Sequence, residues 1–398
     1  MRDVCAIVFF PDDAAREGLE KPLMLQKALF CPVAAWVAQA LSAVGVERFF
    51  LVCHDKYKEE AVSCFPEGSV VTAGSENPAE QLRAFLSEQE TGEVVVVTRP
   101  TLILDGGVRI FRDELPQPKK GKPTGLFRLE LETMKTALEG GEDFRKLLAD
   151  KGRELLRTDS ENALPPALSV ESASDLYQVQ QIARYDVIAR HVSAGVQFLD
   201  ANQVYIDPRV RIGKGTFILP GTILRGNTSI GLDCELGPNA MITDCTVGDG
   251  TLVNASQLNE SVIGSRTKIG PFAYVRPNCV IGDGNKIGDF VEVKNSNLGE
   301  GVKISHLTYV GDSDIGSDVN LGCGTVTVNY DGNTKARTVV GEGAFVGCNT
   351  NLIAPVVVGE GAYVAAGSTI TEDVPPGSLA IARAQQTVKK QWVHKRRK

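Results

Sequence analysis

Between residues 206 and 374 an aliphatic residue recurs at every sixth position. A period of six fits neither an amphipathic helix nor an alternating strand. It is typical of a parallel β-helix, in which each hexad forms one short strand and one corner, and three hexads close a triangular coil. The unbroken runs are Ile212, Ile218, Leu224, Ile230, Leu236 and Ile242; Ile269, Val275, Ile281, Ile287 and Val293; and Val340, Val346, Leu352, Val358, Val364 and Ile370.

Glycine follows many of these aliphatic residues, as at Gly213, Gly270 and Gly288, and it lets the chain turn sharply. We therefore expect the aliphatic side chains to point into the coil. Successive coils should stack at the strand spacing of about 4.8 Å, each covering the apolar interior of the next.

The pattern changes before the coil. Strand-like apolar runs alternate there with stretches of helical spacing, which predicts an α/β unit with a parallel sheet. Residues 173–192 also have helical spacing, with Ser174 and Asp175 as the expected cap. The expected strands are 4–10, 49–53 and 94–97, and the expected helices are 32–44 and 79–88.

Two stretches resemble connections, 118–123 as a loop and 158–172 as a linker. The chain is therefore expected to have four parts. They are an α/β domain at 1–165, a linker and connecting helix at 166–195, the β-helix at 196–375 and a basic tail at 376–398.

A nucleotide-binding α/β unit should follow its first strand with a glycine-rich loop, because only then can backbone N–H groups approach phosphates. Residues 10–16 contain no glycine and carry the carboxylates Asp12 and Asp13. Thr98-Arg99 follows the third expected strand, where a metal-binding Asp would be useful. The sequence thus predicts the frame of a nucleotide domain without its chemistry.

The hexad rhythm of the coil breaks twice. A step of five separates Val293 from Leu298, and residues 327–337 leave the pattern until it resumes at Val340. The Asn, Asp and Gly residues in the second break predict an extruded loop. Loops on a rigid scaffold often carry function.

Arg276 and Lys294 each follow an aliphatic anchor and lie one coil apart, so they should stack on the outer surface about 5 Å apart. Two cations this close repel unless an anion bridges them, and a phosphate suits both side chains. The alternative is a pair of solvated charges with Glu292 as a partner.

His306 lies just after the first break in the rhythm. An imidazole titrates near neutral pH and can take a proton from an amine, so His306 is a candidate general base. The alternative is a hydrogen-bonded surface histidine. No pair of histidines has metal-ligand spacing, so we expect no metal site.

The chain of 398 residues has a net charge of −7, which gives no overall attraction for nucleic acid or an anionic membrane. Nine cysteines without a CxxC pair indicate reduced thiols in a cytoplasmic protein. The N-terminus lacks the apolar core of a signal peptide, and no run of about 18 apolar residues could span a membrane. The basic tail is either solvated or anion-binding.

Several motifs from about residue 173 to the C-terminus resemble one family. It is the acetyltransferase half of the bacterial bifunctional enzyme glucosamine-1-phosphate N-acetyltransferase / N-acetylglucosamine-1-phosphate uridyltransferase. The motifs are His306-Leu-Thr-Tyr309, Asn320-Leu-Gly-Cys-Gly-Thr, Asn329-Tyr330-Asp-Gly with Lys335, Arg276-Pro, Val-Glu-Val-Lys294, Ala365-Ala366-Gly, and Ala-Ile-Ala-Arg383.

The resemblance implies a left-handed β-helix that assembles as a homotrimer with active sites between subunits. It implies that His306 is the general base for transfer from acetyl-CoA to glucosamine 1-phosphate, with no metal needed for that step. The implied contacts to the sugar or its phosphate are Arg276, Lys294, Tyr309, Asn320 and Lys335. The implied contacts to acetyl-CoA are Asn329, Tyr330, Cys348, Ala366 and Arg383.

Two departures from the family concern Cys348 and the N-terminal half. Cys348 stands where the family usually has Ser, and it is either a conservative replacement or a nucleophile for a covalent acyl intermediate. The N-terminal half resembles the family's nucleotidyltransferase domain (Rossmann-like) only in outline, so we expect uridyl transfer to be lost. The alternatives are a bifunctional enzyme, an acyltransferase for another amino-sugar phosphate or sugar nucleotide, and a non-catalytic β-helix scaffold.

Overall fold

The computed structural model describes residues 4–73, 78–104, 123–155 and 167–396. The chain divides into an α/β unit, Met1–Ala194 with Tyr205–Pro208, and a coil unit, Gly195–Val204 with Arg209–Lys398. The predicted loop at 118–123, apart from Pro123, and linker residues 158–166 lie outside the described residues. Within the described residues, no helix is long and apolar enough to cross a membrane.

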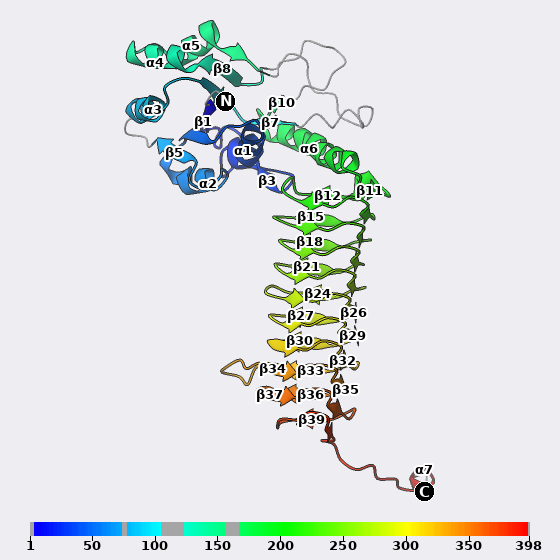
Figure 1. The fold of residues 1–398 in the computed structure, drawn as a ribbon. Helices are drawn as coiled ribbons and strands as arrows, with labels where there is room; N and C mark the ends of the chain where they lie inside the picture. Colours follow the sequence, from blue (N-terminus) through cyan, green and yellow to red (C-terminus); the bar gives the residue numbers. More distant parts are fainter. Residues whose placement is uncertain (1–3, 74–77, 105–122, 156–166, 397–398) are drawn as a thin grey trace. The chain divides into compact units, whose positions relative to one another are not determined.

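The α/β unit is built on a six-stranded sheet in the order β5-β4-β1-β6-β8-β9 (Figure 1). The first four strands in this order run parallel, as the sequence predicted, and β8 and β9 add an antiparallel edge. Their bounds are β1 Val4–Phe9, β4 Arg48–Val52, β5 Val70–Ala73, β6 Glu93–Val97, β8 Leu126–Glu130 and β9 Arg153–Glu154.

The apolar runs of β1 and β6 are buried because helices cover the sheet, and Cys5, Ile7, Val94 and Val96 share one core with helix residues such as Leu86. The expected helices at 32–44 and 79–88 are present as α1 and α3. The helices of this unit are α1 Val33–Ala43, α2 Lys58–Val62, α3 Pro78–Ser87, α4 Leu131–Glu139 and α5 Phe144–Lys151.

The stretch expected to be a linker ends in a strand and not in open chain. β10, Ala167–Ser169, pairs antiparallel with β7, Thr101–Ile103. The helix α6 follows as Ala173–Ser193, and its N-cap is Ser172 and not the expected Ser174. The reason is that the Ser172 hydroxyl accepts a hydrogen bond from the N–H of Asp175 at 3.1 Å.

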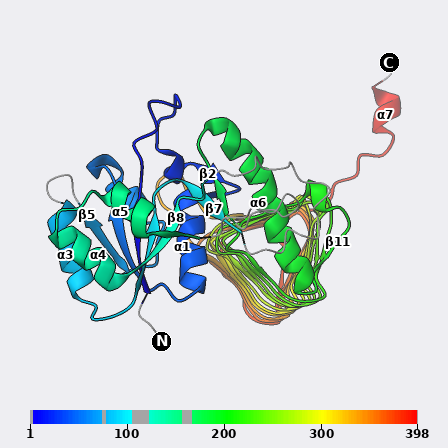
Figure 2. The same ribbon diagram turned by 90° about the horizontal axis from the view of Figure 1, so that it is seen from above.

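The coil unit has three parallel sheets of 11, 10 and 9 short strands. We call them face 1 (the sheet from β11 Gln197–Phe198 to β40 Leu379–Ala380), face 2 (the sheet that ends at β39 Thr369–Ile370) and face 3 (from β13 Arg211–Ile212 to β37 Val356–Val358). Seen along its axis, successive turns superpose into a triangular outline (Figure 2). The aliphatic residues of the three predicted runs are all buried, Ile212 being the most exposed at 9%.

The corner between faces 1 and 2 takes a left-handed backbone conformation in successive coils. Small or polar residues such as Asn239 fill most of these positions, but Phe272, Phe290 and Leu307 occupy three consecutive ones with φ of 59°, 56° and 47°. Bulky side chains rarely adopt this conformation. All three side chains are more than half exposed, and the two phenylalanine rings stack 5.5 Å apart.

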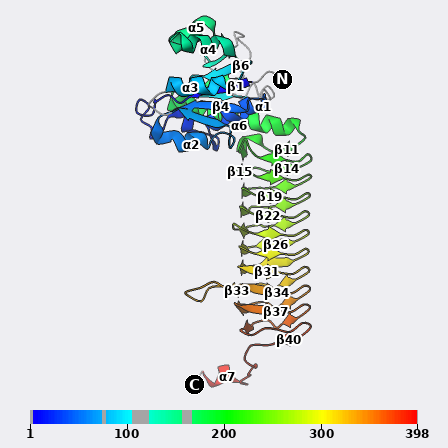
Figure 3. The ribbon, with the colours of Figure 1, turned by 60° about the vertical axis from the view of Figure 1, so that its left-hand side comes forward.

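Both breaks in the hexad rhythm appear as predicted. β27, Glu292–Lys294, is followed by β28, Asn297–Leu298, after a shortened corner. The second break is a loop that projects from the coil between β33, Val326–Val328, and β34, Thr338–Val340 (Figure 3).

We expect Ile287→Ala to destabilise the coil by about 2–5 kcal/mol, because it removes a fully buried anchor and leaves a cavity. Lys286→Ala, the exposed neighbour on the same strand, is the matched control and should change stability by less than about 0.5 kcal/mol. Urea unfolding followed by circular dichroism measures both. Equal midpoints for the two variants would contradict an inward-facing anchor at residue 287.

Candidate active site on the coil

Arg276 and Lys294 occupy neighbouring rungs of face 2. Val275 pairs in register with Val293, and the N–H of Arg276 donates to the carbonyl of Val293 at 2.8 Å. The two cations therefore follow paired anchors on the outer surface, at the spacing that an anion could bridge.

The two cations differ in their present partners. Arg276 forms an ion pair with Glu292 at 2.9 Å, and this hydrogen bond raises the pKa of the guanidinium. Both side chains are more than one-third exposed, so this ion pair contributes little to stability. Lys294 makes no ion pair within 4.0 Å among the residues that the structure describes, and its ammonium is available for an anionic ligand.

Asp312 is the buried carboxylate around which this end of face 2 is arranged. It is 5% exposed, and it accepts hydrogen bonds from Asn295 at 2.5 Å and from the amide of Asn329. Burial by itself raises the pKa of Asp312, but these two amides and the charges of Lys294 and Lys335 outweigh it and lower the pKa. The carboxylate therefore stays ionised, and its charge interacts with Lys294 and Lys335, two residues expected to bind the sugar phosphate.

The projecting loop is ordered by its own contacts. Tyr330 and Lys335 form an antiparallel bridge across it, and Asp331 accepts backbone N–H bonds at its tip. At its base Arg337 pairs with Asp314 at 2.7 Å, which lowers the pKa of that carboxyl. The loop thus presents Tyr330 and Lys335 from a fixed base.

His306 lies at the corner between faces 1 and 2, directly above Asp289 of the preceding coil. The two residues are in register, and Nδ1 of His306 lies 2.5 Å from Oδ1 of Asp289. The hydrogen bond to His306 lowers the pKa of Asp289, so the carboxylate is charged beside the imidazole. Nε2 makes no hydrogen bond within the described residues, and it is the nitrogen left to act as a base.

The same corner carries a column of aligned residues, two of which are candidate coenzyme contacts. The anchors Ile304, Leu321, Val346 and Val364 pair in register from coil to coil, and the residue two positions after each forms the column. It spans three coil spacings, about 14 Å at the usual strand separation. Its members in order are His306, Cys323, Cys348 and Ala366.

Arg383 lies at the end of this column. Its Cδ atom is 3.6 Å from the position that a Cβ on Gly367 would take, directly after Ala366. The arrangement puts an arginine at one end of an exposed column and an imidazole at the other.

The remaining candidates fall on both faces beside the corner. Tyr309 is on face 2, in register with Glu292. Asn320 is on face 1, stacked between Lys303 and Phe345. Within one chain, therefore, Asn320 does not join Arg276 and Lys294 on their face.

Sequence reasoning missed Asp289 and Asp312. Each stands one coil from a residue that the sequence did single out, at a separation of 17 residues from His306 and Asn329. An acidic residue one turn before each polar candidate was the available signal, but shortened corners after Val293 and after Val310 had reduced the regular spacing of 18 to 17.

In the α/β unit, the residues that follow β1 and β6, where a nucleotide-binding domain would carry its phosphate and metal ligands, make contacts within the unit. Asp13 is buried, accepts the N–H of Leu23 at 2.9 Å, and has its pKa raised by burial. Arg99 pairs with Glu171 at 3.1 Å. Both groups shape loops of this unit.

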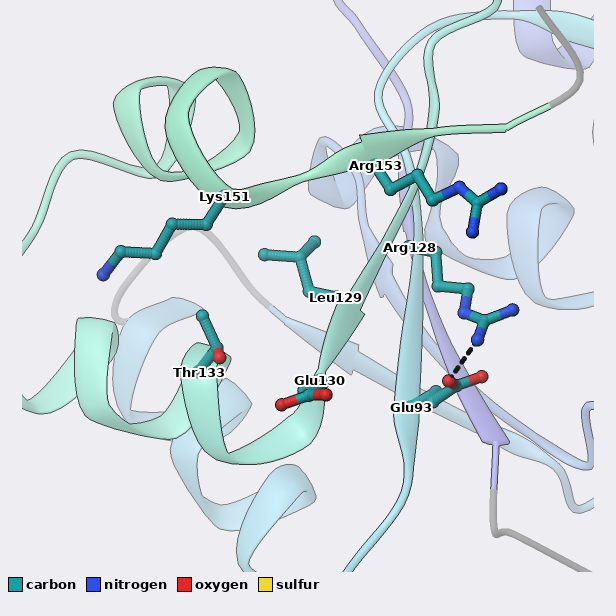
Figure 4. A pocket seen from close by; sticks show the side chains of 7 residues that line it. All are labelled: Glu93, Arg128, Leu129, Glu130, Thr133, Lys151 and Arg153. Atoms are coloured by element: carbon teal, nitrogen blue, oxygen red, sulfur yellow. Dashed lines mark hydrogen bonds and ion pairs between the residues drawn. The ribbon is translucent and has the colours of Figure 1, made fainter.

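A hollow of about 370 Å³ lies at the antiparallel edge of the same sheet (Figure 4). Its charges are mixed, and Arg128 is already paired with Glu93 at 2.5 Å. Among the described residues, no group of three His, Cys, Asp or Glu side chains could hold a metal ion. The lining residues are Glu93, Arg128, Leu129, Glu130, Thr133, Lys151 and Arg153.

The family model of the bacterial transferase hexapeptide (six repeats) matches residues 260–295 and 337–372. Together with the three stacked faces, this match defines a left-handed parallel β-helix of hexapeptide repeats. Among solved structures, the UDP-N-acetylglucosamine acyltransferase of Francisella novicida is 18% identical, with a TM-score of 0.35 over 45% of this chain and 65% of that one. PerB of Caulobacter crescentus, in complex with CoA and GDP-perosamine, is 28% identical, with a TM-score of 0.26 over 29% of this chain and 54% of that one.

Curated relatives share the name bifunctional protein GlmU. That of Clostridium kluyveri is 46% identical over 258 residues, which cover 64% of this chain and 55% of the relative. That of a Geobacillus species is 50% identical over 226 residues, or 57% of this chain and 49% of the relative. Over this segment the chain is similar to the GlmU proteins, and it spans about half the length of the curated relatives it matches.

Asp312→Asn should lower the stability of the coil at neutral pH, because an ionised acceptor of two amide hydrogen bonds is replaced. The folded pKa of Asp312 is depressed, so its contribution is present above the unfolded value of about 3.9 and is lost as the pH falls through the folded value. The difference in melting temperature between wild type and variant should therefore shrink below about pH 4. Glu300→Gln, an exposed carboxylate with no ion pair among the described residues, is the control, and a similar pH trend in it would contradict the assignment to Asp312.

Proposed function

We propose that the coil transfers an acetyl group from acetyl-CoA to the amine of glucosamine 1-phosphate, in the biosynthesis of UDP-N-acetylglucosamine. The observation that carries the proposal is the contact between His306 and Asp289, in line with the candidate coenzyme contacts Cys348 and Ala366 further along the same corner. The resemblance of this segment to the family's acetyltransferase half supplies the substrates.

In this proposal His306 takes a proton at Nε2 as the sugar amine attacks the thioester carbonyl. Asp289 holds the imidazole through Nδ1 and stabilises the imidazolium that forms. His306 is then a catalytic residue, and Asp289 positions it. General-base assistance of this kind typically contributes a factor of about 10² to 10⁴ in rate.

A backbone N–H near the glycine-rich turn can stabilise the oxyanion of the intermediate. The N–H groups of Gly322, Gly324 and Thr325 already donate to backbone carbonyls at 2.8 to 3.1 Å. The N–H of Cys323 makes no hydrogen bond within the described residues, and it is the donor we assign. One such donor is worth about 3 kcal/mol in the transition state.

The sugar phosphate is assigned to Arg276, Lys294 and Lys335, with Tyr309 and Asn320 as sugar contacts. The charge of the ionised Asp312 interacts with Lys294 and Lys335. Asn329, Tyr330, Cys348, Ala366 and Arg383 are assigned to acetyl-CoA, where Arg383 suits a coenzyme phosphate. Asn329 has already given its amide to Asp312, so its oxygen remains for the ligand.

A homotrimer with sites between subunits is part of the proposal. Phe272, Phe290 and Leu307 support it, because three bulky residues accept a strained backbone and remain exposed directly beside Asp289 and His306. Such a boundary would also let Asn320 of a neighbouring subunit complete the sugar site from the other side. We place the protein in the cytoplasm, in keeping with its nine free thiols.

Uridyl transfer is assigned as lost in this chain. Its support is the absence of a glycine-rich loop after β1, where the carboxylates Asp12 and Asp13 stand. The rival is a bifunctional enzyme, and turnover of UTP with magnesium and N-acetylglucosamine 1-phosphate would establish it.

The deciding assay follows thiol release from acetyl-CoA in the presence of glucosamine 1-phosphate, beside the UTP assay. His306→Ala should lower turnover by a factor of about 10² to 10⁴ while acetyl-CoA still binds, because only the general base is removed. His191→Ala is a control in the other unit. Unchanged turnover in His306→Ala, or no thiol release by wild type with any amino-sugar phosphate, would overturn the proposal.

Asp289→Asn should lower kcat about tenfold with little change in the KM for either substrate, because the carboxylate positions the imidazole and contacts neither substrate. Asp283→Asn removes a carboxylate from another corner of the same turn and should leave kcat unchanged. A loss of activity that falls on KM and not on kcat would assign Asp289 a structural role only.

A further inference from the structure

Two of the nine cysteines differ from the rest of the coil's thiols. Cys234, Cys245 and Cys279 are buried, donate to backbone carbonyls, and have their pKa raised by burial. Cys348 is exposed and Cys323 is half-buried, and neither thiol forms a hydrogen bond within the described residues. They are the accessible thiols of the coil.

Cys323 and Cys348 occupy the same corner position in consecutive coils. The N–H of Asn349 donates to the carbonyl of Cys323 at 2.7 Å, and a Cβ on Gly322 would lie 2.6 Å from the nitrogen of Cys348. Neighbouring strands lie about 4.8 Å apart, inside the Cα separation of about 4.4 to 6.8 Å that a disulfide needs.

The same column shows that side chains at this position can meet across one coil spacing. His306 stands one turn before Cys323 and Asp289 two turns before it, and the side-chain atoms of this pair lie 2.5 Å apart. The side chains of adjacent column members therefore point along compatible directions, which is the condition that two thiols must meet to be joined.

We propose that Cys323 and Cys348 are a modification site, a thiol pair that closes reversibly into a disulfide within one chain. The oxidant is a low-molecular-weight disulfide. One cysteine thiolate attacks it and releases one small thiol, and the second cysteine thiolate attacks the mixed disulfide and releases the other. Two cysteine thiols are oxidised, one small disulfide is reduced to two thiols, and the protons pass between them.

The consequence for activity rests on the proposed function. The pair stands between His306 and Ala366 on the assigned path of the coenzyme, and the Cys323 N–H is the assigned oxyanion donor. Closing the disulfide fixes both side chains across that path, so acetyl transfer should fall at least tenfold and return on reduction. The α/β unit takes no part in the proposed thiol switch.

The test uses the 398-residue chain incubated with excess oxidised glutathione and analysed by mass spectrometry without reduction. We expect a mass loss of about two units per disulfide and a single peptide link between residues 323 and 348, reversed by dithiothreitol. Cys323→Ser and Cys348→Ser should each retain a mixed disulfide with glutathione, because the resolving thiol is gone. Cys279→Ser, which removes a buried thiol elsewhere in the coil unit, should behave as wild type.

Stable glutathione adducts on both cysteines of the wild type, no oxidation of either, or a link between two chains would overturn the pair. An oxidised protein that carries the 323–348 link and transfers acetyl groups at an unchanged rate would overturn its regulatory role. If the reduced protein shows no acetyl transfer, the proposed function fails, and the peptide link still decides the existence of the pair.

Discussion

The hydrogen bond from each coil to the next is the interaction on which the rest of the coil unit depends. A strand two or three residues long has no stability of its own, so each is held by the coils before and after it. The bonds fix the register, and the register decides which side chains become neighbours. Arg276 and Lys294 follow anchors that pair in register, and Asp289 meets His306 because their strands pair in register.

The fixed register also explains how functional side chains are placed on a regular β-helix. A side chain at a given corner has one neighbour above and one below, so a single polar substitution creates a contact only if the adjacent coil carries a partner. The carboxylates Asp289 and Asp312 are such partners, one for an imidazole and the other for two amides. Each carboxylate contacts a residue of the adjacent turn and not a residue near it in the sequence.

Much of the coil unit could be predicted from the sequence, because the six-residue period by itself gives both the inward-facing positions and the length of each turn. The buried anchors, the in-register strands that carry Arg276 and Lys294, and the projecting loop all follow from counting in sixes. The carboxylate contacts could not be predicted, because shortened corners after Val293 and after Val310 change the length of the turn from 18 to 17 residues. In the α/β unit, alternation predicted the parallel strands, but the Ser172 cap and β10 depended on pairing with distant segments.

The projecting loop leaves β33 and returns at β34, and the strands on either side of it still pair with their neighbours in register. Arg337 and Asn329 fasten its two ends to carboxylates of the preceding coil. The length of the projecting loop can therefore change without altering the register of the coil unit. Residues could be gained or lost at its tip over evolution, and substrate preference could drift with them, while the imidazole and its carboxylate remain aligned.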